Sequence, residues 1–252
     1  MITINHKKWS IRGIESIFFD KDGTIIDSHL YWGEIVKRRA REIMKNFNLH
    51  SKIEYSYLCK IMGFSLAKEK LNRDGPTGLF DRSFIINIVV SKLRNLKIET
   101  TFEEIDNIFK KVHNDFLNEI DKYTKVIPEV YDFIFKLKEK DVKLALITSD
   151  SIKNTDIILK HIGMENLFDI VIGKENCSEP KVSGKPALFA LEKLKMNAYN
   201  TVCIGDAPMD KTMADNANIL KTILVATGQI TYNYLKRISK YSTKSLGELK
   251  IE

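Results

Sequence analysis

Two aspartates that stand two residues apart give the strongest chemical signal in this sequence. The segment Asp20–Thr24 (DKDGT) directly follows the apolar run 17–19, a pattern that predicts a buried strand ending in a glycine-containing loop. Ligands of open α/β sheets bind at this end of the strands. There, one carboxylate can attack phosphorus as a nucleophile while a second donates and accepts protons. Because such paired charges repel a phosphate, a cation such as Mg²⁺ is expected between them.

A hydroxyl and a lysine follow at positions where they could bind a phosphate. Thr148 ends the apolar run 142–147, and Ser149 and Asp150 come directly after it. Lys185 precedes Pro186, and proline is typical of the first turn of a helix, so the ammonium could reach a phosphate near that helix start. Each feature alone also fits a strand-end threonine or a surface lysine.

A second pair of carboxylates follows another predicted strand. Asp206 and Asp210 come after the apolar run 201–204, in the segment GDAPMD. Either could be an ordinary turn residue, as Asp20 and Asp22 could belong to an Asp-Gly turn. The coincidence of all four segments at strand ends or helix starts favours a metal-assisted site over four unrelated turns.

Strand patterns alternate with helix patterns in the first and last parts of the chain. We predict strands at 17–19, 142–147, 169–172, 201–204 and 222–225, and helices at 152–161, 187–194 and 208–214. This alternation indicates βαβ units and therefore an α/β fold with a Rossmann-like parallel sheet. Residues 1–27 and 125–252 are expected to form this core domain.

Residues 28–124 are expected to form a separate α-helical cap domain. Apolar residues recur there at steps of three and four, and no segment has a convincing strand pattern. Thr101 and Glu104 have the spacing of a capping box, which predicts a helix start. The basic run Lys37–Arg39 is interpreted as a solvated helix face.

Composition narrows the class of protein. The 40 Lys and Arg residues exceed the 33 Asp and Glu residues by seven, but they are scattered, which favours solvated faces over a nucleic-acid surface. No apolar run approaches the ~18 residues that a membrane span requires. Three cysteines without metal-like spacing, and no secretory signal, predict a reduced cytoplasmic protein. A monomer or a homodimer is expected.

The four segments together resemble the motifs of the haloacid dehalogenase superfamily, and the resemblance covers nearly all of the chain outside the helical insert. It implies Asp20 as nucleophile and Asp22 as general acid and base. It also implies that Asp20, Asp206 and the backbone carbonyl of Asp22 bind Mg²⁺, and that Asp210 supports the metal. Thr148 and Lys185 would hold the phosphoryl group. The insert resembles the α-helical C1-type cap of phosphoglycolate phosphatases and β-phosphoglucomutases.

The sequence departs from that family pattern at two lysines. Lys185 is followed by Pro-Ala-Leu where the family often has Pro-x-Pro, and Lys181 is a nearby competitor without a following proline. Lys21 stands where the family usually has an apolar residue. Asp22, which dehalogenases and phosphonate-cleaving relatives lack, argues for phosphate-ester chemistry.

The resemblance therefore implies a phosphohydrolase that acts on a small phosphorylated metabolite, such as a sugar phosphate or a phosphoglycolate-like compound. A phosphomutase of the β-phosphoglucomutase type is the alternative, and a nucleic-acid end phosphatase is less favoured. Ser149, Asp150, Trp32, Arg73 and Arg82 are candidates for substrate contact. Trp32 could instead belong to the cap core, and the two arginines could be solvated.

Overall fold

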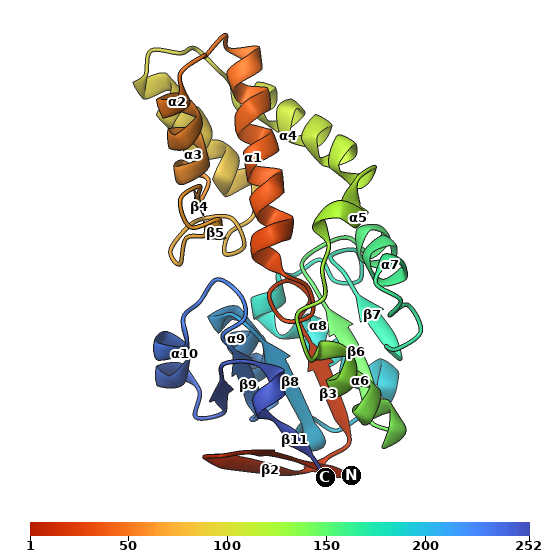
Figure 1. Ribbon diagram of the computed structural model, residues 1–252. Coiled ribbons are helices and arrows are strands. Elements are labelled where there is room, and N and C mark those ends of the chain that lie inside the picture. The colour runs from red at the N-terminus through yellow and green to blue at the C-terminus, as the bar shows by residue number, and fades with distance from the viewer. The chain divides into compact units, whose positions relative to one another are not determined.

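The computed structural model describes the backbone of residues 1–252 and the side chains of all of them except positions 52 and 53. The chain forms two compact units. One consists of Met1–Asp27 and Lys125–Glu252, and the other of Ser28–Thr124. We call the first unit the core domain and the second the cap (Figure 1).

The core domain is built on a six-stranded sheet in which every pair of neighbouring strands is parallel. In order across the sheet, the strands are β10 (Ser242–Thr243), β9 (Thr222–Val225), β8 (Thr201–Gly205), β3 (Ser16–Phe19), β6 (Lys143–Ile147) and β7 (Ile170–Ile172). Phe19 of β3 pairs with Leu146 on one side and Ile204 on the other. This register brings the carboxyl ends of β3, β6 and β8 together.

Helices cover both faces of this sheet. They are α6 (Val130–Glu139), α7 (Ile152–His161), α8 (Lys185–Leu194), α9 (Pro208–Asn216) and α10 (Tyr232–Ile238), with short 3₁₀ turns η1 (Lys181–Ser183), η2 (Ala198–Asn200) and η3 (Leu246–Glu248). Neighbouring residues of a strand point to opposite faces. Phe18 accordingly packs in a cluster with residues of α8 and α9, while Phe19 meets Phe133 of α6 edge-on.

The α/β fold and all eight elements predicted in this unit are confirmed, with ends shifted by two residues or fewer. The sequence patterns did not reveal α6, α10 or a small antiparallel sheet. That sheet has the strand order β11-β1-β2 and joins the two ends of the chain. Its strands are β1 (Ile2–His6), β2 (Trp9–Ile14) and β11 (Lys250–Ile251).

The cap is predominantly helical and has its own apolar core. Its helices are α1 (Ser28–Asn46), α2 (Lys52–Ile61), α3 (Arg82–Asn95), α4 (Phe102–Leu117) and α5 (Ile120–Tyr123). The predicted capping box opens α4: Glu104 N–H donates to the Thr101 hydroxyl at 3.2 Å, and Thr101 N–H donates to the Glu104 carboxylate at 2.9 Å. An unpredicted pair of two-residue strands, β4 (Phe64–Ser65) and β5 (Lys70–Leu71), interrupts the helices.

The two segments of the core domain that flank the insert are hydrogen-bonded to each other. Asp27 N–H donates to the Lys125 carbonyl, and Ile127 N–H donates to the Ile25 carbonyl, each at 2.9 Å. Ile26 and Val126 form an antiparallel bridge between these bonds. Among the described residues, no helix has the length and apolar character that a bilayer crossing requires.

Candidate active site

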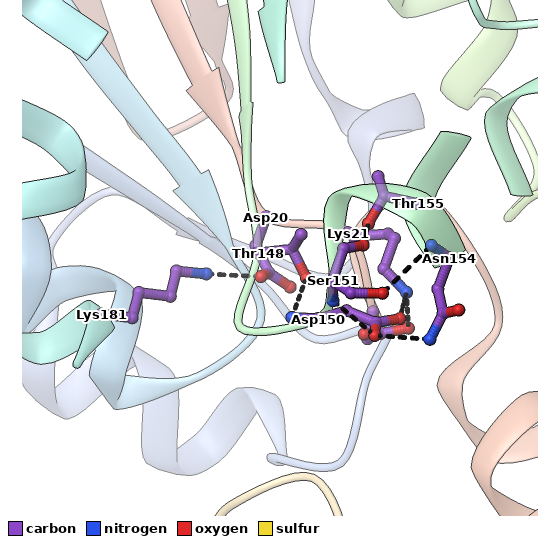
Figure 2. Close-up of polar contacts among 9 residues, drawn as sticks. Asp20, Lys21, Thr148, Asp150, Ser151, Asn154, Thr155 and Lys181 are labelled. Atoms are coloured by element: carbon purple, nitrogen blue, oxygen red, sulfur yellow. Dashed lines mark hydrogen bonds and ion pairs between the residues drawn. The ribbon is translucent and has the colours of Figure 1, made fainter. Parts of the chain in front are cut away.

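Asp20 lies at the carboxyl end of the central strand β3 and is paired with a buried lysine. Its backbone N–H donates to the Ile204 carbonyl at 2.9 Å, which continues the pairing with β8. Lys181 Nζ donates to Asp20 Oδ1 (Figure 2). It also lies 2.7 Å from Asp210 Oδ1. Burial raises the pKa of Asp20 to about 7: Lys181 opposes the rise, whereas the charges of Asp210 and Asp22 add to it.

Lys181, and not Lys185, contacts Asp20, so the prediction that Lys185 neutralises Asp20 is wrong. The Lys185 side chain is 57% exposed, and its nearest ion-pair partner is Glu179 at 4.0 Å. Lys181 lies in η1, which packs against α9, and this packing directs its side chain to Asp210. Gly184, with φ of 82°, turns the chain between the two lysines, so Lys185 starts α8 on the solvent side.

Three carboxylates gather at the ends of β3 and β8. Asp20, Asp206 and Asp210 each offer one oxygen, and these oxygens lie within 4.8 Å of one another. Burial, together with the charges of Asp20 and Asp210, raises the pKa of Asp206 well above its ordinary value. Lys181 supplies one positive charge against three negative ones, and hard oxygen donors are the ligands that Mg²⁺ prefers. The residues therefore fit a magnesium ion.

Glycines keep the space around these carboxylates clear. A Cβ atom on Gly228 would lie 1.7 Å from Asp206 Oδ2, and one on Gly23 would lie 2.5 Å from it. The Thr227 hydroxyl donates to the Gly23 carbonyl at 2.6 Å and so fastens the two loops together. Sequence inspection missed Gly228, although its place just after the predicted strand 222–225 was a usable signal.

Asp22 is held by a second buried lysine. Lys21 is fully buried, and its Nζ lies 3.1 Å from Asp22 Oδ1 and 3.3 Å from Asp150 Oδ2. Burial raises the pKa of Asp22 although Lys21 opposes the rise. In Figure 2 the Lys21 side chain extends from the loop after β3 to Asp150, which lies just before α7.

Both oxygens of Asp150 are bound by protein groups. Oδ2 contacts Lys21, and Oδ1 accepts from Ser151 N–H at 2.7 Å and from Asn154 Nδ2 at 3.1 Å. Burial alone would raise the pKa of Asp150, but Lys21 and these donors bring it below its ordinary value. The structure thus gives Asp150, a predicted substrate contact, the role of a partner for Lys21.

Thr148 and Ser149 follow β6 as expected. Thr148 N–H donates to the Ile172 carbonyl at 2.9 Å, and its hydroxyl accepts from Asp150 N–H at 3.1 Å. Thr148 is buried, whereas Ser149 is exposed. Because β6 pairs with β3, Thr148 just after β6 lies next to the end of the strand that Asp20 follows.

The cap candidates have partners inside the cap. Trp32 packs against the apolar core of the cap, which is the alternative considered above. Arg82 binds the Asp106 carboxylate at 3.0 Å and the Asp106 carbonyl at 2.8 Å. Arg73 is 46% exposed and lies 3.7 Å from Asp74.

Known proteins resemble this chain in sequence and in fold. The family model described as haloacid dehalogenase-like hydrolase matches residues 17–225. Pyrophosphatase PpaX of Oceanobacillus iheyensis is 24% identical over 225 residues, which are 88% of each chain, and phosphoglycolate phosphatase of Colwellia psychrerythraea is 25% identical over 227 residues, 90% of this chain and 89% of the relative. A crystal structure of a predicted phosphoglycolate phosphatase from Haemophilus somnus has a TM-score of 0.69 at 19% identity, covering 94% of this chain and 97% of that one. Since the family model spans most of the sequence, this protein belongs to the haloacid dehalogenase-like hydrolase family.

Proposed function

We propose that this protein hydrolyses phosphate monoesters of small metabolites, with Asp20 as the nucleophile. The observation that carries the proposal is the pairing of partly buried Asp20 with buried Lys181 beside two further carboxylates. Relatives named phosphatases and pyrophosphatases, aligned over most of the chain, support a phosphate substrate. Their names differ in substrate, so the class of reaction is proposed here and not one metabolite.

The first step transfers the phosphoryl group to Asp20. Lys181 holds Oδ1 of Asp20, so Oδ2 is the oxygen that attacks phosphorus. The bond from phosphorus to the ester oxygen breaks, and an aspartyl-phosphate remains. The Lys181 charge reduces the repulsion between carboxylate and phosphate, and the Thr148 hydroxyl would bind a phosphoryl oxygen.

Asp22 moves the protons of both steps. Its raised pKa favours the protonated form, which gives its proton to the departing ester oxygen. The resulting carboxylate then takes a proton from the water that attacks phosphorus, and the bond to Asp20 breaks to release phosphate. Lys21 fixes Oδ1 of Asp22, which assigns the proton to Oδ2.

Asp20, Asp206 and Asp210, with the backbone carbonyl of Asp22, would hold Mg²⁺. The bound ion supplies positive charge that offsets the charges of the phosphate and the carboxylates.

Asp20→Asn tests the proposal, because an amide of nearly equal shape is a very poor nucleophile. We expect turnover of a panel of phosphate esters with Mg²⁺ to fall by about 10⁴-fold or more. Asp215→Asn, which changes an exposed aspartate of α9 paired with Lys211, should retain activity. Rapid-quench intact mass spectrometry should detect an added phosphoryl group on the wild type and on Asp215→Asn, but not on Asp20→Asn. Normal turnover by Asp20→Asn, in a sample free of deamidation, would refute the assignment.

A further inference from the structure

The basic run at the middle of α1 has one member without an acidic partner. Glu34 binds three cations of the same helix: Lys37 at 3.0 Å, Arg38 at 3.1 Å and Arg41 at 3.3 Å. Among the described side chains, none forms an ion pair or a hydrogen bond with Arg39. The unpartnered cation is therefore one of four close neighbours, and the other three share a carboxylate.

Arg39 is also the most deeply buried of these four residues, which overturns the interpretation of the run as a solvated face. It is 5% exposed and lies four residues from both Ile35 and Ile43 on the buried face of α1. Its guanidinium lies 4.0 Å from the centre of the Phe109 ring. Such a cation–π contact returns much less free energy than the burial of an unpaired charge costs.

The surroundings of Arg39 carry excess positive charge. Arg82 lies against the same Phe109 ring at 5.9 Å, and the Nε atoms of both arginines are buried without a hydrogen-bond acceptor. The Asp106 carboxylate is shared between Arg82 at 3.0 Å and Lys110 at 2.7 Å. This part of the cap thus holds three cations, Arg39, Arg82 and Lys110, and one carboxylate, Asp106. Burial and the nearby Arg82 lower the pKa of Arg39 to about 9, so the guanidinium still carries its charge at neutral pH.

We propose that Arg39 and Arg82 form an oxyanion-binding site within the cap, which takes a carboxylate, phosphate or sulfate group. The planar guanidinium pairs bidentately with such groups, and a bound anion supplies the counter-charge and the acceptors that Arg39 lacks. The anion is a free oxyanion, and the site does not depend on the phosphatase function proposed above.

Thermal unfolding of the full chain tests the site directly. The protein is unfolded without divalent metal in sodium chloride and in sodium sulfate at matched ionic strength. Arg39→Met removes the unpaired charge and keeps an apolar stem, so it should unfold at or above the wild-type temperature in chloride. Saturating sulfate should then raise the unfolding temperature of the wild type by about 5 °C more than that of the variant.

Two further variants control this comparison. Arg41→Met removes an exposed arginine of the same helix that is paired with Glu34, and its response to sulfate should equal that of the wild type. Arg39→Lys keeps the charge but loses the planar fork, so most of the sulfate response should disappear even if Arg39→Met does not fold.

The proposal is overturned if Arg39→Met and the wild type respond equally to sulfate. It is also overturned if Arg39→Met and Arg39→Lys are both destabilised by an amount that does not depend on sulfate, because Arg39 would then be a structural residue.

Discussion

Buried cations are compensated within the core domain but not within the cap. In the core domain, Lys181 lies between Asp20 and Asp210, and Lys21 lies between Asp22 and Asp150. In the cap, Arg39 is buried to a similar extent and has no carboxylate partner among the side chains that the structure describes. A buried charge is tolerated when its partners are fixed and fully hydrogen-bonded. The core lysines therefore hold the carboxylates of the proposed active site in place before any ligand arrives, whereas Arg39 depends on a counter-charge from elsewhere.

The largest effect is expected when the compensation at Asp20 is removed. Lys181→Met should lower kcat by about 10³-fold or more, because Asp20 and Asp210 lose the cation that holds them beside the phosphate. Lys185→Met is the matched control and should change kcat less than about twofold, since an exposed side chain at that site gains little from its ion pair. Steady-state kinetics on one phosphate ester measure both variants. Equal losses would restore Lys185 to the site.

Removal of Lys21 should have a smaller effect, and a second substitution should reverse part of it. Lys21→Met leaves Asp22 and Asp150 facing each other without their shared cation, so kcat should fall by about 10- to 100-fold and unfolding should become easier by about 3 kcal/mol. Replacing Asp150 with Leu in the same chain removes the unpaired charge and should recover most of the stability but not the rate. Urea titration and initial rates separate the two outcomes. Full recovery of the rate would show that Lys21 does not position Asp22.

The smallest effect is expected on the unfolding temperature when no metal is bound to Asp20, Asp206 and Asp210. The pKa of Asp20 is about 7 in the folded protein and 3.8 ordinarily, so between these values the folded state binds the proton more tightly than the unfolded state. Stability without divalent metal should therefore fall as pH rises from about 4 to 7. Compared with Asp20→Asn, the wild type should lose about 5 °C of its unfolding temperature between pH 5 and pH 8. Mg²⁺ should abolish this difference, and a gap that is the same at both pH values would contradict the assignment of Asp20 to the cluster.

Local patterns predicted the elements of the core domain well because most of them are short, largely apolar runs or helices with recognisable ends. The end of β3, with the aspartates after it, is one local signal of this kind. The capping box that opens α4 is a local signal in the cap. The small sheet formed by β1, β2 and β11 escaped prediction, since it pairs residue 3 with residue 252 and no local signal reports such a contact.

The two errors about basic residues have different physical causes. Lys185 was preferred because the proline after it marks a helix start, but a helix start does not tell which way the preceding side chains point. Lys181 is selected by the packing of η1 on α9, a tertiary contact. Arg39 has the four-residue spacing of a core position, yet its charge and its basic neighbours favoured a solvated face. Helical periodicity was the better guide there.

The bonds that join Asp27 to Lys125 and Ile25 to Ile127 have a consequence for how such a protein can be remodelled. The insert leaves and re-enters the core domain at neighbouring points, so the core sheet does not have to open to accommodate it. Since loop-closure entropy grows only slowly with loop length, a cap of a different size could be spliced in at the same two points with little loss of core stability. A cap can thus be exchanged as a unit during evolution or in the laboratory, while the aspartates of the core domain are inherited unchanged.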